Sequence, residues 1–251
     1  MKKILIAVLL LVSVRLFAQD INVISKEALN LERSLKEEQA LDKYKQVLTA
    51  EPLNLQALIK ASELSIAMGG RHPDKKVKTD YFNLAKDYSD KALSVDSNSA
   101  DANYVRSVAA WKLSEVEQEN KKVLADVKEA YIYANRAVSI NPNHGKANYA
   151  LGKWHYDLVT VNWAKKAAAN VLYGGGIPKA SLEVAFKYME KCKTLEPYFV
   201  RNFLDLGKAY KYDHKPAKAI EVLSQLVKLP NRTGDDAALK AEGKTLLSEM
   251  Q

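Results

Sequence analysis

The sequence predicts an all-α protein: a right-handed α-α superhelix of about five helix pairs with lengthened helices and a C-terminal capping helix. The first observation is a repeated spacing, in which a small residue is followed twelve positions later by a residue that ends a helix, as in Ala40 and Pro52. The small residue lets two helices cross closely, and the proline stops the second helix. The same spacing occurs at Ala85 and Ser97, Ala130 and Pro142, and Ala185 and Pro197, with a shorter copy at Ala219 and Pro230.

A second observation concerns the first helix of each pair. Leu151-Gly152 and Leu206-Gly207 place a glycine where the paired helix approaches closely. The corresponding residues of the three earlier pairs are also small, namely Ala28, Ser62 and Ser107. Beyond the last pair, Thr233–Asp236 predicts the start of a final helix that ends near Met250. A polar-faced final helix is what covers the exposed end of a helical stack.

The length of the units varies along the chain. The turn positions at residues 52, 97, 142, 197 and 230 are separated by 45, 45, 55 and 33 residues, whereas an ordinary repeat of this kind has about 34. Two units therefore carry roughly eleven extra residues and one carries roughly twenty-one. Eleven residues make about three helical turns, so the insertions are expected to lengthen helices and to keep their apolar faces in phase.

Turns within the units follow from local signals. In the second unit, Gly69–Pro73 is expected to form a loop, after which Thr79 or Asp80 caps a long helix. The third unit has neither glycine nor proline, so its helices must be long, with their turn within Glu117–Lys122. The fifth unit is short, with its turn at Asp213–Pro216.

The fourth unit, His144–Pro197, reads as two long helices separated by a glycine run and Pro178. Because Gly174–Gly176 follows a helix and not a strand, it predicts a helix stop, and not a phosphate-binding loop. The stretch from Trp163 to Ala180 is the inserted element. We expect Trp163 and Leu172 to pack against neighbouring repeats.

The N-terminus predicts an export signal over residues 1–18, followed by a helical-repeat domain over residues 19–251. Lys2 and Lys3 give a basic start, Ile4–Val14 is an apolar run of eleven residues, and Ala18 offers a small residue for cleavage. The alternative is an uncleaved membrane anchor, which Arg15 disfavours because a spanning helix needs about 20 apolar residues. We therefore expect an exported protein, periplasmic or envelope-associated in a Gram-negative bacterium.

Composition disfavours several classes of function. Without residues 1–18 the chain keeps 35 basic and 30 acidic residues, interspersed at helical spacing, which is typical of solvated helix faces and not of nucleic-acid binding. No metal site or cofactor is expected, because no histidine has a partner at metal-ligand spacing; the histidines are His72, His144, His155 and His214. No motif for nucleophilic catalysis is present. Cys192 takes a small-residue position of its helix pair, which predicts a buried structural thiol.

These features resemble the tetratricopeptide repeat over nearly all of residues 21–230. From Ala130 onward the chain also resembles the regulator of microtubule dynamics family, helical-repeat proteins known mainly from animals. The matching phrases are Leu151–Trp154, Trp163 with Lys165-Lys166, Leu195–Pro197, Lys208 with Tyr210, and Leu229-Pro230 with Thr233 and Asp235-Asp236. The resemblance implies the fold, including an enlarged fourth repeat with Trp154 and Trp163, and no catalytic residue. It implies no activity on microtubules, which an exported bacterial protein does not meet.

In tetratricopeptide repeats the first helices line an inner groove, where we expect the partner to bind. Counting along these helices predicts the groove residues Tyr104, Val108 and Trp111 in the third unit, Tyr149, Lys153 and Tyr156 in the fourth, and Arg201, Leu204, Lys208 and Lys211 in the fifth. An aromatic patch thus turns into a basic one, which suits an acidic peptide tail or an anionic amphiphile. The alternative is that these aromatic residues pack against the lengthened helices.

The favoured hypothesis is a non-enzymatic, exported module that binds a protein or peptide partner in this groove, without metal, cofactor or nucleic acid. The alternative is a carrier of lipid or another small amphiphile, in which the long insertion and the tryptophans enclose an apolar cavity. A hydrolase is the weakest hypothesis, because no residue indicates one.

Overall fold

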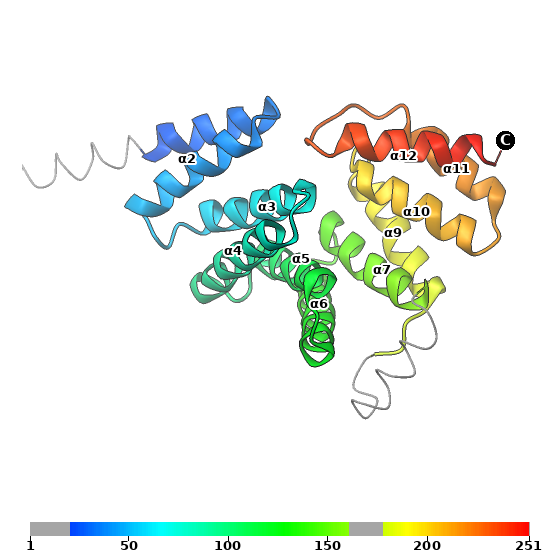
Figure 1. The fold of residues 1–251 in the computed structure, drawn as a ribbon, viewed down its shortest axis with the longest axis horizontal. Coiled ribbons are helices and arrows are strands. Elements are labelled where there is room, and N and C mark those ends of the chain that lie inside the picture. Colours follow the sequence, from blue (N-terminus) through cyan, green and yellow to red (C-terminus); the bar gives the residue numbers. More distant parts are fainter. Residues whose placement is uncertain (1–20, 161–177, 251) are drawn as a thin grey trace, which may run out of the picture.

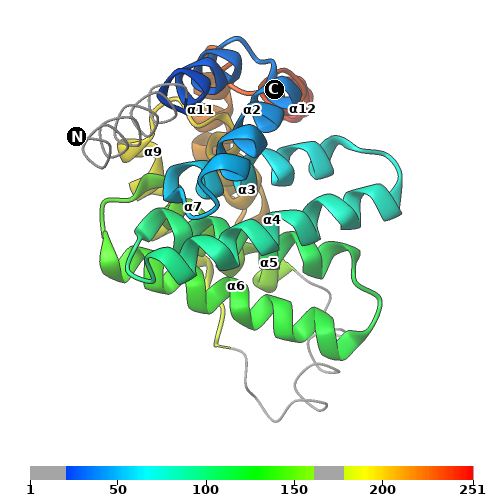
Figure 2. The same ribbon diagram turned by 90° about the vertical axis from the view of Figure 1, so that its left-hand side faces the viewer.

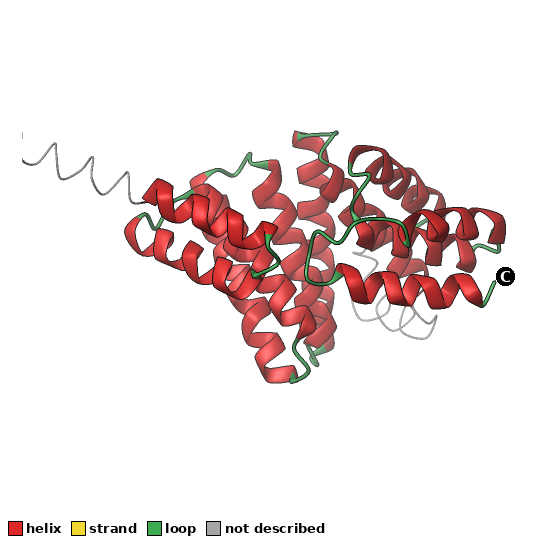
Figure 3. Ribbon diagram, turned by 90° about the horizontal axis from the view of Figure 1, so that it is seen from above, coloured by secondary structure: helices red, strands yellow, loops and turns green. Residues whose placement is uncertain are grey.

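The computed structural model describes residues 21–160 and 178–250, and within these ranges it consists of helices joined by loops, without strands (Figure 3). The first helix covers residues 21–33. The helices that follow are α2 (Glu37–Ala50), α3 (Leu55–Arg71), α4 (Lys75–Val95), α5 (Ala100–Val116), α6 (Asn120–Ile140), α7 (Gly145–Thr160), α9 (Leu182–Leu195), α10 (Val200–Tyr212), α11 (Pro216–Leu226) and α12 (Asp236–Ser248).

Within the described ranges, successive helices form five pairs, and the pairs stack into a curved α-α superhelix (Figures 1 and 2). The helix over residues 21–33 shares a buried core with α2. The other pairs are α3 with α4, α5 with α6, α7 with α9, and α10 with α11, while α12 packs on α10 and α11. The predicted fold class, with about five helix pairs and a C-terminal capping helix, is therefore confirmed.

The extra residues of the second and third units lengthen their helices, as predicted. Helices α4 and α6 each have 21 residues, whereas α10 and α11 of the regular fifth unit have 13 and 11. The turns at Glu117–Lys122 and at Asp213–Pro216 are also confirmed: α5 ends at Val116, and α11 begins at Pro216.

Side-chain caps determine where three helices begin. Asn54, Asp74 and Ser99 each accept a hydrogen bond from the backbone N–H three residues ahead, at distances of 3.0, 2.9 and 3.2 Å. The predicted cap at Thr79 or Asp80 is wrong, because Asp74 already starts α4. Thr79 lies inside the helix, where its hydroxyl donates to the Lys75 carbonyl at 2.8 Å.

The predicted loop over Gly69–Pro73 is too long. Helix α3 continues through both glycines to Arg71, and the chain leaves the helix at His72. Gly69 faces α4 so closely that an added Cβ would lie 2.7 Å from the Phe82 ring and 2.9 Å from Tyr81 Cβ. Gly69 therefore allows a close helix crossing instead of ending the helix, while Gly70 faces open space.

These neighbouring glycines give a matched pair of variants. We expect Gly69→Ala to lower the free energy of unfolding by about 1–3 kcal/mol, because its methyl group overpacks the contact with Phe82. Gly70→Ala should raise it by about 0.5–1 kcal/mol, because alanine favours the helix and meets no neighbour. Urea unfolding monitored by circular dichroism measures both. Equal effects of the two changes would contradict the close crossing.

Small residues lie where the two helices of a pair cross. Ser62 donates to the Ala85 carbonyl and Ser107 to the Ala130 carbonyl, each at 2.8 Å. In the fourth unit the equivalent Gly152 carries no such bond, and an added Cβ would lie 3.0 Å from the Ala185 carbonyl oxygen and 2.8 Å from Met189 Cγ. The residue at this position of the first helix thus either donates a hydrogen bond to the paired helix, when it is serine, or leaves room for that helix, when it is glycine.

The buried state predicted for Cys192 is confirmed, since its side chain has no exposed surface. The predicted packing of Trp163 and Leu172 lies outside the described residues, as does the predicted export signal over residues 1–18. Among the helices of residues 21–160 and 178–250, none is long and apolar enough to cross a membrane.

Candidate functional site on the concave face

The concave face of the superhelix is lined by the first helix of each pair, namely residues 21–33, α3, α5, α7 and α10. Figure 1 shows that the loop before α12 returns toward α2 and α3, so that the last helix lies near the first units. The predicted groove residues lie on α5, α7 and α10, and their surroundings differ.

Tyr104 and Tyr149 are buried and expose only 9% and 7% of their surface. The Tyr104 ring lies 5.3 Å from the His144 ring, and the Tyr149 hydroxyl donates to Asp205 at 2.6 Å. Burial raises the pKa of Tyr104 to about 12, and burial together with Asp205 raises the pKa of Tyr149 well above 10. Both hydroxyls are therefore neutral hydrogen-bonding groups at physiological pH.

Lys153 and Tyr156 belong to a group that remains partly accessible. The Lys153 ammonium donates to both carboxylate oxygens of Asp157, one helical turn further along α7. The Tyr156 ring meets the Tyr212 ring of α10 edge-on, with centroids 6.3 Å apart. Burial raises the pKa of Asp157 to about 6, an effect that the Lys153 ammonium partly offsets. We call Lys153, Tyr156, Asp157 and Tyr212 the tyrosine patch.

The remaining apolar groove residues contribute mainly to packing. Trp111 packs on the cluster that contains Val127 of α6 and Trp154 of α7. Val108 packs against the core between the second and fourth units. Leu204 is 1% exposed and lies in the core of the last two units.

The predicted cations of the fifth unit pair with acids of the C-terminal segment. Arg201 contacts Asp235 at 2.5 Å, Lys208 contacts Glu242 at 2.6 Å, and Lys211 contacts Glu249 at 2.7 Å. Helix α12 thus lies along α10 and neutralises the basic patch that the sequence predicts. Binding of an anionic partner to Lys208 and Lys211 remains a prediction.

Counting along the helices missed an ionic cluster that joins α3 to α7 across the concave face. Glu63 lies 2.9 Å from Lys146 of α7 and 3.2 Å from Lys60, which also contacts Glu32 of the first helix at 3.1 Å. Burial would raise the pKa of Glu63, but Lys146 and Lys60 outweigh it and lower the pKa to about 2. The sequence contains a signal for Glu63. It lies one position after the small residue Ser62, just as the predicted groove residue Lys153 lies one position after Gly152.

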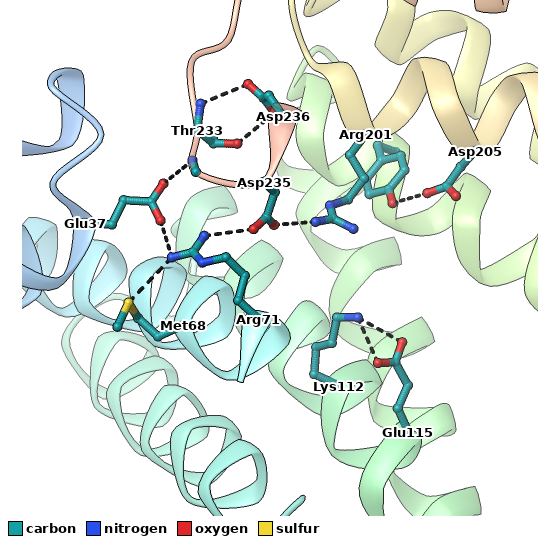
Figure 4. A network of polar contacts seen from close by, with 12 residues as sticks. Glu37, Met68, Arg71, Lys112, Glu115, Arg201, Asp205, Thr233, Asp235 and Asp236 are labelled. Atoms are coloured by element: carbon teal, nitrogen blue, oxygen red, sulfur yellow. Dashed lines mark hydrogen bonds and ion pairs between the residues drawn. The ribbon is translucent and has the colours of Figure 1, made fainter. Parts of the chain in front are cut away.

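A second missed group joins the C-terminal loop to the first two units (Figure 4). Arg71, at the end of α3, donates to Asp235 at 2.8 Å and to Glu37 at 2.5 Å, and Glu37 accepts the Gly234 N–H at 2.8 Å. Asp235 also receives Arg201. We call these five residues, Glu37, Arg71, Arg201, Gly234 and Asp235, the seam. Arg71 and Asp235 lie 164 positions apart in the sequence, which explains why no local pattern predicts the seam.

Within the described ranges, no group of three or more histidine, cysteine, aspartate or glutamate side chains could hold a metal ion. The concave face thus offers tyrosine hydroxyls, paired charges and a partly accessible aromatic surface.

A comparison with protein families identifies the chain. The family model for regulator of microtubule dynamics protein 1-3 matches residues 24–251. The chain belongs to the regulator of microtubule dynamics family. The match extends the resemblance predicted from Ala130 onward to nearly the whole chain.

Two curated relatives show the distance within the regulator of microtubule dynamics family. Regulator of microtubule dynamics protein 1 from Bos taurus is 25% identical over 213 residues, covering 83% of this chain and 64% of that protein. Regulator of microtubule dynamics protein 3 from Xenopus laevis is 26% identical over 181 residues, covering 70% of this chain and 37% of that protein. The chain thus spans less than two thirds of the length of these relatives.

Solved structures support the repeat fold of this family member. A thermophilic TPR protein from Thermus thermophilus superimposes with a TM-score of 0.65 at 13% identity, over 91% of this chain and 99% of that one. PilW, a widely conserved type IV pilus biogenesis factor, gives a TM-score of 0.54 at 17% identity, over 92% and 90% of the two chains. The tetratricopeptide-like fold is therefore confirmed.

Proposed function

We propose that this member of the regulator of microtubule dynamics family is a non-catalytic module that binds a protein or peptide segment along its concave face. The observation that supports it best is the tyrosine patch, whose side chains are held by intrachain contacts and yet remain partly exposed. Tyr212 exposes 48% of its surface, and the Lys153 side chain exposes 24%. Side chains that are fixed before binding lose little conformational freedom when a partner arrives, which favours affinity.

The chemistry of the patch suits an extended polypeptide. The Tyr156 and Tyr212 rings offer apolar faces to the side chains of a peptide. Their hydroxyls and the Lys153–Asp157 pair can donate hydrogen bonds to backbone C=O groups and accept them from backbone N–H groups. Tyrosine is common at binding hot spots because it buries much area with few rotatable bonds. The patch lies where α7 meets α10, next to the Tyr149–Asp205 hydrogen bond.

The test uses peptides selected from a displayed random library on the purified protein. We expect selected peptides to lose at least about tenfold in affinity, or about 1.4 kcal/mol, for a Tyr156→Ser/Tyr212→Ser variant, measured by fluorescence polarisation. The matched control is Val95→Ser/Ile132→Ser, which removes two exposed apolar residues from the outer helices α4 and α6. Equal losses for both variants, or no loss for either, would place binding elsewhere on the molecule.

The alternative of a lipid carrier depends on the inserted element, most of which lies outside the described residues. Mass spectrometry of the purified protein separates the two functions. A retained lipid that competes with the selected peptides would favour the carrier. We also propose that residues 1–18 direct export, supported by Lys2, Lys3 and the apolar run after them. A mature protein that begins at Gln19 would bear this out.

A further inference from the structure

One carboxylate at the seam is shared by two arginines that come from the second and the fifth helix pairs. Arg71 Nη1 lies 2.8 Å from Asp235 Oδ1, and Arg201 Nη2 lies 2.5 Å from Asp235 Oδ2. Each carboxylate oxygen thus has its own guanidinium group, as Figure 4 shows. Guanidinium groups match carboxylates in shape and charge, so this is an effective way to hold a single acidic group.

The attachment of Asp235 to this site is polar and partly open to solvent. Residues 231–234 of the loop are exposed, and the side chains of Arg71, Arg201 and Asp235 expose 35%, 36% and 19% of their surface. Ion pairs of this kind contribute little to stability and weaken with salt. Helix α12 itself packs on α10 and α11. The loop can therefore leave the arginines without disturbing the helix packing that holds α12.

Departure of Asp235 would leave Arg201 without the carboxylate that it contacts. Arg71 would keep its contact with Glu37 at 2.5 Å. The Asp205 carboxylate, on the same helix as Arg201, accepts the Tyr149 hydroxyl instead. Asp205 keeps its charge near Arg201, so the vacant hydrogen-bonding positions of the two guanidinium groups, and not an excess of charge, would favour a new carboxylate.

We propose that Arg71 and Arg201 form a carboxylate-binding site for an acidic peptide segment, and that Asp235 occupies this site until such a segment replaces it. The proposal rests on the proposed function, because it names the chemistry of the partner on the same concave face. A peptide carboxylate reproduces the geometry already present, with one oxygen for each arginine. A phosphate headgroup would bring more negative charge close to Glu37. Asp235 and the peptide carboxylate thus compete for Arg71 and Arg201.

The first experiment tests the seam without any ligand. Spin labels on Gln39→Cys and Ala238→Cys, two exposed positions of α2 and α12, report the distance across the seam by pulsed electron resonance. We expect Asp235→Asn to broaden and lengthen this distance, because the amide has no charge to offer the arginines. The control Glu242→Gln removes an equal charge from α12 at its pair with Lys208 and should leave the distance unchanged. Circular dichroism confirms that each variant is folded.

The second experiment measures binding of an oligoglutamate peptide by calorimetry. If the closed form makes up about nine-tenths of the wild-type molecules, Asp235→Asn should bind about tenfold more tightly. Adding Arg201→Gln to this variant should abolish the gain. An oligoglutamate with an amidated C-terminus and an oligoglutamine with a free one distinguish a side-chain carboxylate from a terminal carboxylate.

Three results would overturn the proposal. The first is an unchanged distance and affinity in Asp235→Asn, and the second is an opened seam that binds no oligoglutamate. The third is binding to phosphatidylglycerol vesicles but not to oligoglutamate. None of them decides the proposed function, because peptides that depend on Tyr156 and Tyr212 are selected and measured independently.

Discussion

Replacing Trp154 by alanine should lower the free energy of unfolding by about 3–5 kcal/mol. Trp154 is 2% exposed and is the bulkiest of the buried side chains in the described part of the chain. Its indole N–H donates to the Val127 carbonyl of α6 at 2.9 Å, and its ring lies 4.7 Å from that of Tyr131. Alanine would leave a cavity at the contact between the third and fourth units and would remove the hydrogen bond that joins them.

Two further variants separate the contributions of Trp154. Trp154→Phe keeps most of the ring but loses the hydrogen bond to Val127, so we expect a loss of about 1–3 kcal/mol. Trp111→Ala, in the same cluster but only partly buried, should cost less than Trp154→Ala. Urea unfolding followed by far-ultraviolet circular dichroism avoids the change in tryptophan fluorescence. A loss below about 1 kcal/mol for Trp154→Ala would contradict this central role.

Replacing Glu63 by glutamine should destabilise the protein in a pH-dependent manner. Lys146 and Lys60 overcome the effect of burial and lower the Glu63 pKa from 4.5 to about 2. Because the folded state favours the ionised carboxylate, its contribution to stability is fully present above pH 4.5 and is lost as the pH falls toward 2. At about 1.4 kcal/mol per pKa unit, a lowering from 4.5 to about 2 corresponds to about 3.5 kcal/mol. The side chain is 22% exposed, and screening by solvent reduces the expected contribution at pH 7 to about 2–3 kcal/mol.

The measurement is the difference in unfolding free energy between wild type and Glu63→Gln across this pH range. We expect the difference to be largest at pH 7, to be mostly lost near pH 2, where about half of the folded molecules carry a protonated Glu63, and to vanish only below pH 2. Glu38→Gln, at an exposed position of α2, controls for the loss of one negative charge. A difference that stays constant with pH would mean that the ionic cluster with Lys146 contributes nothing and that glutamine merely packs poorly.

The helix pairs could be predicted because their signals are local. The spacing from Ala130 to Pro142 reports one helix and its turn, and every unit repeats such a signal. The loop predicted at Gly69 was too long because a glycine near the end of a helical stretch usually marks the end of the helix. At Gly69 the ring of Phe82 instead occupies the space where a side chain would lie. The residue that makes Gly69 necessary lies on another helix and cannot be read from its surroundings in the sequence.

The concave face could be predicted by position but not by partner. Counting along the repeats placed Arg201 on the right helix, yet its charge is balanced by Asp235, which comes from the loop after the fifth pair. The same holds for Lys208 and Glu242. These two pairs depend on how α12 packs on α10. The contact of Arg71 with Asp235 depends on how far the superhelix curves, and the curvature is the sum of many small rotations between units. No single stretch of sequence carries that sum.

In a linear array of repeats each unit touches only its neighbours, so the outermost units fray first and independently of each other. The contacts of Glu37 and Arg71 with Gly234 and Asp235 give the first two units a polar neighbour that their place in the row would not provide. While the seam is formed, opening of the C-terminal loop therefore also changes the surroundings of α2 and α3.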